Sequence, residues 1–118
     1  RPSRRIVVRD CAYSGTAGGG MAIGSEMSGG VEEVFCERYR MNEVAHGLYF
    51  KSNKDRGGYI RDVHFRDVEI GRAQCPLIVT TDYHGYRGGA FPTRMTDLSV
   101  ADVRCNDAIV GLSLVGAE

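Results

Sequence analysis

Two short segments, "VFCERY" (34–39) and "LYFKS" (48–52), decide the fold of this chain because the pair recurs along it. The first segment recurs as "IVVRDC" (6–11), "VHFRDV" (63–68) and "LSVADV" (98–103). The second recurs as "MAIGS" (21–25), "LIVTT" (77–81) and "LSLVG" (112–116). Successive first segments start 28, 29 and 35 residues apart, and successive second segments start 27, 29 and 35 residues apart. The agreement between the two series predicts stacked structural repeats.

Each segment alternates apolar and polar residues, which is the pattern of a strand with one buried face. Helical periodicity is missing, and glycines separate the repeats. Units of about 28 residues with two or three short strands are typical of the coils of a parallel β-helix. A β-sandwich of eight short strands is the alternative, but the equal offsets favour stacked coils. The whole chain, residues 1–118, is expected to form one all-β solenoid domain of about four coils.

Stacking the repeats predicts four interior columns with one residue from each coil. The columns are Ile6/Val34/Val63/Leu98, Val8/Cys36/Phe65/Val100, Cys11/Tyr39/Val68/Val103 and Tyr13/Met41/Ile70/Cys105. Three of the four cysteines fall in these columns, and Cys75 precedes Pro76 at a strand entry. Because buried free cysteine behaves as a small apolar residue, free thiols are expected rather than a disulfide framework.

Composition narrows the possible partners. The 15 basic and 15 acidic residues balance, so no net field draws the chain to nucleic acid. No apolar run approaches the roughly 20 residues of a membrane-spanning helix. No close-spaced metal-ligand pattern appears, and neither a metal nor another cofactor is expected. No signal-peptide pattern appears either, so secreted, periplasmic and cytoplasmic locations all stay open.

The glycine-rich stretch "GGGMAIGSEMSGG" (18–30) could be a phosphate cradle, but that site needs a helix after the glycines, and "MAIGS" is strand-like. Together with "RPSRRIVVRDC" (1–11), "GLYFKS" (47–52) and "RGGYIRDVHFRDVEIG" (56–71), it resembles the C-terminal half of glycoside hydrolase family 28. This family contains polygalacturonases and related pectin hydrolases. The resemblance implies a right-handed parallel β-helix whose glycines form a tight corner and the open floor of a sugar-binding cleft.

The resemblance also implies hydrolysis with inversion by aspartates of an Asn-Thr-Asp motif and an Asp-Asp pair, and this sequence contains neither. The family's Gly-His-Gly motif aligns with residues 17–19, where Gly18 replaces the histidine. Its Arg-Ile-Lys motif, which binds the substrate carboxylate, aligns with residues 49–51, where only Lys51 remains. Inverting hydrolysis needs a protonated and an ionised carboxyl about 6.5–9.5 Å apart. The chain is therefore expected to be a fragment of a longer enzyme or a shortened relative with another role.

Lys51 and Tyr49 are the first candidates for binding an acidic polysaccharide or oligosaccharide. Strand alternation points both side chains outward, opposite Phe50. The longer 35-residue step predicts an inserted loop, "DYHGYRGGAFPTR" (82–94). Aromatic rings with polar tips suit a sugar surface or an interface, so this loop adds three candidates. They are Asp82, Tyr83 and His84.

Glu26 and His46 are the candidate catalytic residues. Glu26 is a loop acid beside the first glycine-rich coil, and His46 could partly replace the family's missing histidine. Both also fit ordinary surface or turn positions. A Ser–His–acid set drawn from Ser25 or Ser52 with these two residues has no nucleophile-elbow motif to support it.

Three functions remain open from the sequence. The first is a polygalacturonase-like β-helix that acts on pectin-like polysaccharide or derives from enzymes that do. The second is a non-catalytic β-helix for sugar binding or self-assembly. The third is a small hydrolase with a new site near Glu26, His46 and Lys51.

Self-association is expected under any of these functions. The first coil would leave strand N–H and C=O groups and several apolar side chains open to water, and such an edge pairs readily with another chain. These side chains are Ile6, Val8, Cys11, Met21 and Ile23. A homodimer or a trimer is therefore predicted.

Overall fold

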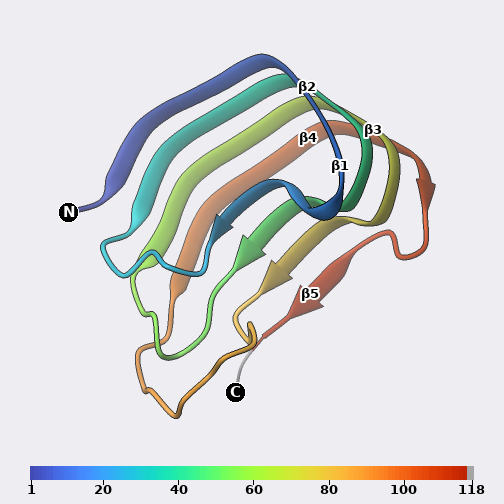
Figure 1. Ribbon diagram of the computed structural model, residues 1–118. Helices are drawn as coiled ribbons and strands as arrows, with labels where there is room; N and C mark the ends of the chain where they lie inside the picture. Colours follow the sequence, from blue (N-terminus) through green and yellow to red (C-terminus); the bar gives the residue numbers. More distant parts are fainter. Residues whose placement is uncertain (117–118) are drawn as a thin grey trace.

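The computed structural model describes residues 1–116, which form a single all-β solenoid (Figure 1). Its strands are β1 (Ser3–Gly24), β2 (Val31–Lys51), β3 (Tyr59–Thr80), β4 (Arg94–Ala108) and β5 (Ser113–Val115). Every strand pairing is parallel, in the order β1-β2-β3-β4 with β5 beside β3. The predicted parallel β-helix is confirmed, and the sandwich alternative is wrong. Residues 117–118 of the predicted domain lie outside the described residues.

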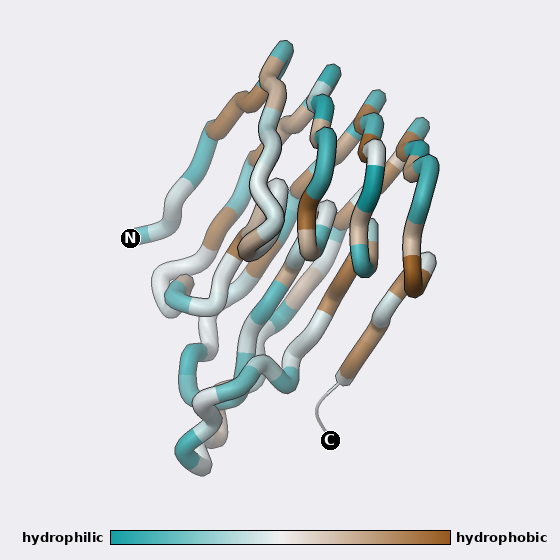
Figure 2. The backbone as a smooth tube through the Cα atoms, turned by 45° about the vertical axis from the view of Figure 1, so that its right-hand side comes forward, coloured by the Kyte–Doolittle hydropathy of each residue, from teal (hydrophilic) through white to brown (hydrophobic). Residues whose placement is uncertain are grey.

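The predicted columns are the register of the sheet. Val34 pairs with Ile6 on one side and with Val63 on the other, and Val63 pairs with Leu98. The other three columns pair in the same way. Figure 2 shows hydrophobic positions recurring at matching levels of neighbouring strands. The core is tightest in the middle coils, where Val63 is fully buried and the rings of Phe50 and Phe65 meet edge to face at 5.6 Å.

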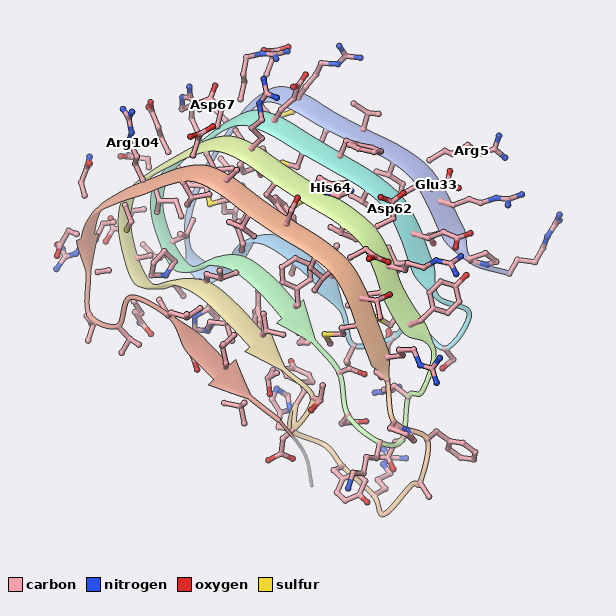
Figure 3. All side chains as sticks on the ribbon, turned by 180° about the vertical axis from the view of Figure 1, so that it is seen from behind. Arg5, Glu33, Asp62, His64, Asp67 and Arg104 are labelled. Carbon is pink, nitrogen blue, oxygen red and sulfur yellow. The ribbon has the colours of Figure 1, made fainter. Side chains whose placement is uncertain are left out.

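Two corners turn each long strand into a coil. At both corners non-glycine residues adopt positive φ angles of 51–57°. They are Arg5, Glu33, Asp62 and Asp97 at the first corner and Asp10, Arg38, Asp67 and Asp102 at the second. Figure 3 shows Arg5, Glu33 and Asp62 in a row across neighbouring strands. Aspartate tolerates this left-handed conformation better than most residues, and five of the eight corner residues are aspartates.

Three residues of the first coil differ from their predicted burial. Cys11 and Tyr13 belong to predicted interior columns but are exposed, because among the described residues β1 has a neighbouring strand on one side only. For Cys11 this agrees with the expectation of an open first coil. Ile23 was expected at an open end, but it is buried because it packs in the core with Met27. Ile6, Val8 and Met21 are partly buried against the same core. The apolar face of the first coil is therefore smaller than the sequence predicts.

All four cysteines are free, and their environments predict different reactivities. Burial, and secondarily the neighbouring Cys11, raises the pKa of Cys36 to about 11. The thiolate is the reactive form, so at pH 8 only about one Cys36 thiol in a thousand is nucleophilic. Iodoacetamide at pH 8 is therefore expected to alkylate Cys11 at least about 100-fold faster than Cys36 in the folded chain.

Peptide mapping by mass spectrometry measures both rates. In denaturant the two cysteines should react at similar rates. Raising the pH toward 11 should speed the reaction of Cys36 in the folded chain as its thiolate fraction grows. Equal rates for Cys11 and Cys36 in the folded chain at pH 8 would contradict the packing described here.

Candidate functional site

The outward face of the second half of β2 carries the candidate binding residues. Strand alternation buries Leu48 and Phe50, which are 0% and 1% exposed. Tyr49 and Lys51 point to the other side and are half-buried. The orientation predicted for this pair is therefore present in the fold.

Lys51 lies between two tyrosine rings. Its Nζ atom is 5.3 Å from the ring centroid of Tyr49 and 4.7 Å from that of Tyr83. The two rings meet edge to face with their centroids 6.2 Å apart. A cation held this close to aromatic rings is stabilised by their quadrupoles. Within residues 1–116 no carboxylate forms an ion pair with Lys51, so its charge is open to an anionic ligand.

Two histidines extend this group. The His46 ring meets Tyr49 edge to face at 5.0 Å, and the His84 ring lies 3.9 Å from that of Tyr83. We call these five residues, His46, Tyr49, Lys51, Tyr83 and His84, the Lys51 cluster. His46 Nδ1 is buried and has no hydrogen-bond partner in the described part of the chain. Burial, with a smaller contribution from Tyr83, raises the pKa of Tyr49, so its hydroxyl keeps its proton at neutral pH and can donate a hydrogen bond.

Small residues of β1 lie beside the Lys51 cluster. Ala22 pairs with Tyr49, and Gly24 pairs with Lys51. Gly24 has a φ of +102°, and a Cβ atom there would collide with the carbonyl oxygen of Lys51. Gly18, at the position aligned with the family's histidine, has a φ of +92° and nothing within 4 Å of a Cβ atom. The glycines thus serve two purposes: close approach of coils at Gly24 and open surface at Gly18.

The segment that follows β2 holds the loop that carries Tyr83 and His84. The Tyr83 amide donates to the Ser52 carbonyl at 2.8 Å. The Asn53 amide group, on a side chain that is 2% exposed, donates to the carbonyls of Tyr83 and His84 at 3.1 and 3.5 Å. Sequence reasoning missed this role of Asn53. The sequence contains one hint of this role: two polar residues, Ser52 and Asn53, follow directly after the strand.

The candidate acids lie apart from this arrangement. Glu26 has a side chain that is 83% exposed and forms its ion pair with Arg56 at 3.7 Å. Asp82 is exposed, and its backbone N–H donates to Thr80 Oγ1 at 3.1 Å. In the described residues neither carboxylate bonds to His46 or Lys51. Ser25 and Ser52 are both buried, and Ser52 bonds to the Thr93 hydroxyl.

The comparisons with known proteins agree with the resemblance. The family described as Glycosyl hydrolases family 28 matches residues 3–113. The chain belongs to glycosyl hydrolase family 28. A probable polygalacturonase of Vitis vinifera is 28% identical over 96 residues, covering 77% of this chain and 20% of that protein. An endo-polygalacturonase of Pectobacterium parmentieri is 33% identical over 86 residues, covering 73% and 21%. This family 28 chain thus spans about a fifth of the length of these curated relatives.

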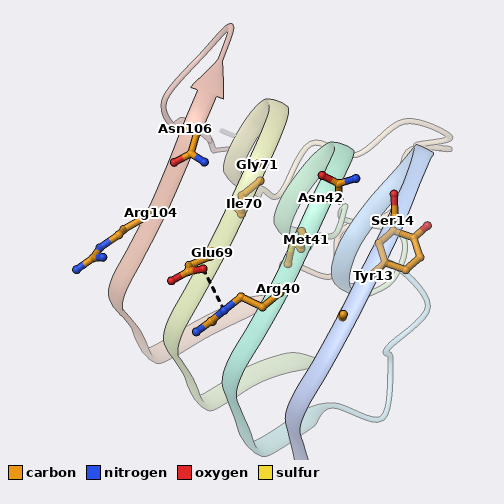
Figure 4. A pocket seen from close by; sticks show the side chains of 11 residues that line it. Tyr13, Ser14, Arg40, Met41, Asn42, Glu69, Ile70, Gly71, Arg104 and Asn106 are labelled. Atoms are coloured by element: carbon orange, nitrogen blue, oxygen red, sulfur yellow. Dashed lines mark ion pairs between the residues drawn. The ribbon is translucent and has the colours of Figure 1, made fainter.

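A separate groove of about 710 Å³ crosses the outside of β1 to β4 beside the second corner (Figure 4). Tyr13, Asn42 and Arg104 are among its lining residues. Arg40, also in its wall, is bound to Glu69 at 3.1 Å and to Asp67 at 3.1 Å, so its charge is compensated. The groove contains no residue of the Lys51 cluster, and of its two arginines Arg40 is paired while Arg104 forms no ion pair with the described residues.

A Ser–His–Asp hydrogen-bond chain also lies away from the Lys51 cluster. His64 bonds to Ser99 Oγ at 2.5 Å through Nδ1 and to Asp62 Oδ1 at 2.7 Å through Nε2. Its ring stacks on Phe35 at 5.2 Å. Figure 3 shows His64 and Asp62 on the outer surface near the first corner. His64 is a hydrogen-bonded surface residue there.

No metal centre or membrane helix emerges from the described residues. Among them, no three His, Cys, Asp or Glu side chains gather to hold a metal ion. The described part of the chain has no helix long and apolar enough to cross a membrane.

Proposed function

We propose that this chain is a polygalacturonase-like β-helix that binds acidic, pectin-like saccharides at the Lys51 cluster and lacks the family's catalytic aspartates. One observation carries the proposal. The Lys51 ammonium group is held between two tyrosine rings and has no carboxylate partner in the described part of the chain. A uronate offers both features that this arrangement can bind, a carboxylate and an apolar C–H face.

The chemistry of the cluster fits one acidic sugar ring. The Lys51 ammonium group would bind the uronate carboxylate by a charge-assisted hydrogen bond. The tyrosine rings would pack on the C–H face of the sugar, and the Tyr49 hydroxyl would donate to a ring hydroxyl. Tyr49 stands where the family has an arginine, so this chain would replace a planar bidentate contact with an aromatic surface.

The activities named for the relatives support the substrate class. The relative of Pectobacterium parmentieri is an endo-polygalacturonase, and so is a relative of Pectobacterium carotovorum that is 30% identical over 86 residues. Polygalacturonate and its oligomers are therefore the saccharides to test first. The same proposal excludes hydrolysis by this chain alone, because Glu26 is paired with Arg56 and no Asn-Thr-Asp or Asp-Asp motif is present.

Lys51→Ala is expected to weaken binding of trigalacturonate by about 1–3 kcal/mol, the loss typical of a charged hydrogen bond. Isothermal titration calorimetry on the folded variant measures the change. Lys54→Ala is the matched control, because Lys51 and Lys54 are the two lysines of the chain and only Lys51 lies over the tyrosine rings. Unchanged affinity in Lys51→Ala would remove Lys51 from the site.

We also propose that the isolated 118-residue chain self-associates. Among the described residues, β1 and β4 each have one unpaired edge along most of their length, and such edges pair with other chains. Large apolar side chains add to this at the β5 end, where Ile109 is 80% and Leu114 is 67% exposed. Analytical ultracentrifugation at micromolar concentration is expected to show a dimer or a trimer. A monomer that stays stable over that concentration range would contradict the proposal.

A further inference from the structure

We infer that Asn53 and Asp55 are positioning residues that latch the loop of residues 81–93 onto the end of β2, so that the Tyr83 ring lies against Lys51 and His84 lies beside Tyr83. Neither residue belongs to the Lys51 cluster itself. The consequence for saccharide binding rests on the proposed function, whereas the latch itself can be tested without a ligand.

Asn53 anchors the start of the loop. Its side chain is 2% exposed, and its Nδ2 group donates to the backbone carbonyls of Tyr83 and His84. Its Oδ1 atom accepts a hydrogen bond from the Asp55 backbone N–H at 3.0 Å. Both ends of the amide are therefore used, and a buried amide in this state costs free energy to disrupt. One buried side chain thus holds the backbone of Tyr83 and His84, the two residues whose rings the loop contributes.

Asp55 anchors the middle of the loop. Its carboxylate accepts hydrogen bonds from the backbone N–H groups of Arg87 and Gly89 at 2.5 and 2.7 Å. The Phe91 N–H donates to the Lys54 carbonyl at 2.8 Å. Hydrogen bonds to an ionised acceptor are stronger than neutral ones. The loop is therefore tied to residues 52–55 at its start, its middle and its end.

Apart from these bonds, hydrogen bonds hold the loop at its two ends, from the Thr81 N–H to the Val115 carbonyl at 2.9 Å and from the Thr93 hydroxyl to the Gly57 carbonyl at 2.8 Å. Residues 81–93 contain no strand or helix, and Gly85 and Gly88 have positive φ angles with nothing within 4 Å of a Cβ atom. The side chains of Tyr86 and Phe91 are 49% and 67% exposed, so they bury little apolar surface. Together with the bond from the Tyr83 N–H to the Ser52 carbonyl, the hydrogen bonds of Asn53 and Asp55 consequently position Tyr83. Fixing a ligand-contacting ring before binding removes part of the entropic cost of binding.

The ligand-free test uses the two lysines. Selective ¹³C-lysine labelling gives NMR signals from Lys51 and Lys54 alone. In the wild-type chain the Lys51 side-chain signals are expected to be shifted upfield by the rings of Tyr49 and Tyr83. Asn53→Ala should lose the Tyr83 part of this shift. It should also raise the rate of trypsin cleavage after Arg87 by about 10-fold or more, because release of the loop frees its backbone to enter the active site of the protease.

Two further variants make the result decisive. Asn42→Ala removes an exposed asparagine of β2 outside the latch and should change neither readout. Asp55→Asn keeps the side-chain shape, weakens the contacts to Arg87 and Gly89, and tests the latch should Asn53→Ala fail to fold. Folded variants with an unchanged Lys51 shift and an unchanged cleavage rate would overturn the inference.

A binding measurement on the same variants tests the consequence for the saccharide. If the latch orders the site for a uronate, Asn53→Ala should bind trigalacturonate about 10-fold more weakly than the wild type while remaining folded. Wild-type protein that does not bind trigalacturonate would refute the proposed function, and the ligand-free readouts would still decide the latch. Full affinity in a variant whose loop is open would overturn the positioning role.

Discussion

The isolated 118-residue chain is expected to release no reducing ends from polygalacturonate above a buffer control. Inverting hydrolysis requires a carboxylic acid on one side of the glycosidic bond and a carboxylate with its water on the other. The chain has neither an Asn-Thr-Asp motif nor an Asp-Asp pair. The Glu26 carboxylate is paired with Arg56. Among the described residues the Asp82 carboxylate forms no ion pair with Lys51. Each missing acid or base removes about 10²–10⁴-fold in rate.

A reducing-sugar assay over several hours, at high protein concentration, measures this directly. A family 28 polygalacturonase with its aspartate motifs intact serves as the positive control. The rate of the isolated chain should lie at least about 10⁴-fold below that of the control. Turnover near 1 per second, the lower end of typical enzyme rates, would show that another carboxyl pair acts in this chain.

Gly24→Ala is expected to lower the free energy of unfolding by about 3–5 kcal/mol, a loss in the range of the most damaging single substitutions. Two costs add at this position. A left-handed φ costs a non-glycine residue about 1–2 kcal/mol. A Cβ atom would also collide with the carbonyl oxygen of Lys51, which belongs to the neighbouring strand and cannot move without opening the β1–β2 pairing.

Gly18→Ala separates these two costs. Gly18 also has a positive φ, but a Cβ atom there meets nothing within 4 Å. Its expected cost is therefore about 1–2 kcal/mol, from the backbone conformation alone. Urea denaturation of both variants gives the comparison. Equal losses in the two variants would show that the close approach at Gly24 contributes nothing.

Much of the fold could be predicted because the spacing of the repeats determines the register of the strands. Val34, Val63 and Leu98 recur at matching positions, and parallel stacking leaves one register that places all of them on the core side. The outward direction of Lys51 followed from the same alternation. The corners could not be predicted in this way. Arg38 and Asp67 look like ordinary polar strand residues, and their left-handed φ angles depend on the coil that they close.

The site was only partly predictable, for a different physical reason. Lys51 and Tyr83 are 32 residues apart in the sequence, and periodicity does not fix the path of an irregular loop. Their contact depends on hydrogen bonds from Asn53 to the loop backbone, which sequence patterns do not reveal. Likewise, the pairing of Glu26 with Arg56 depends on two neighbouring loops. Local patterns predicted which residues face outward, and tertiary contacts decided which of them meet.

The central claim is that the Lys51 cluster binds an acidic sugar through its free positive charge. An NMR titration of the ¹⁵N-labelled chain with trigalacturonate, beside the same titration with its methyl ester, tests this claim most directly. The account predicts saturable shifts centred on Tyr49, Lys51 and Tyr83. The affinity for the uncharged ester should be lower by at least about 10-fold. Equal affinity for both ligands, or shifts centred on the groove beside Arg104, would contradict it.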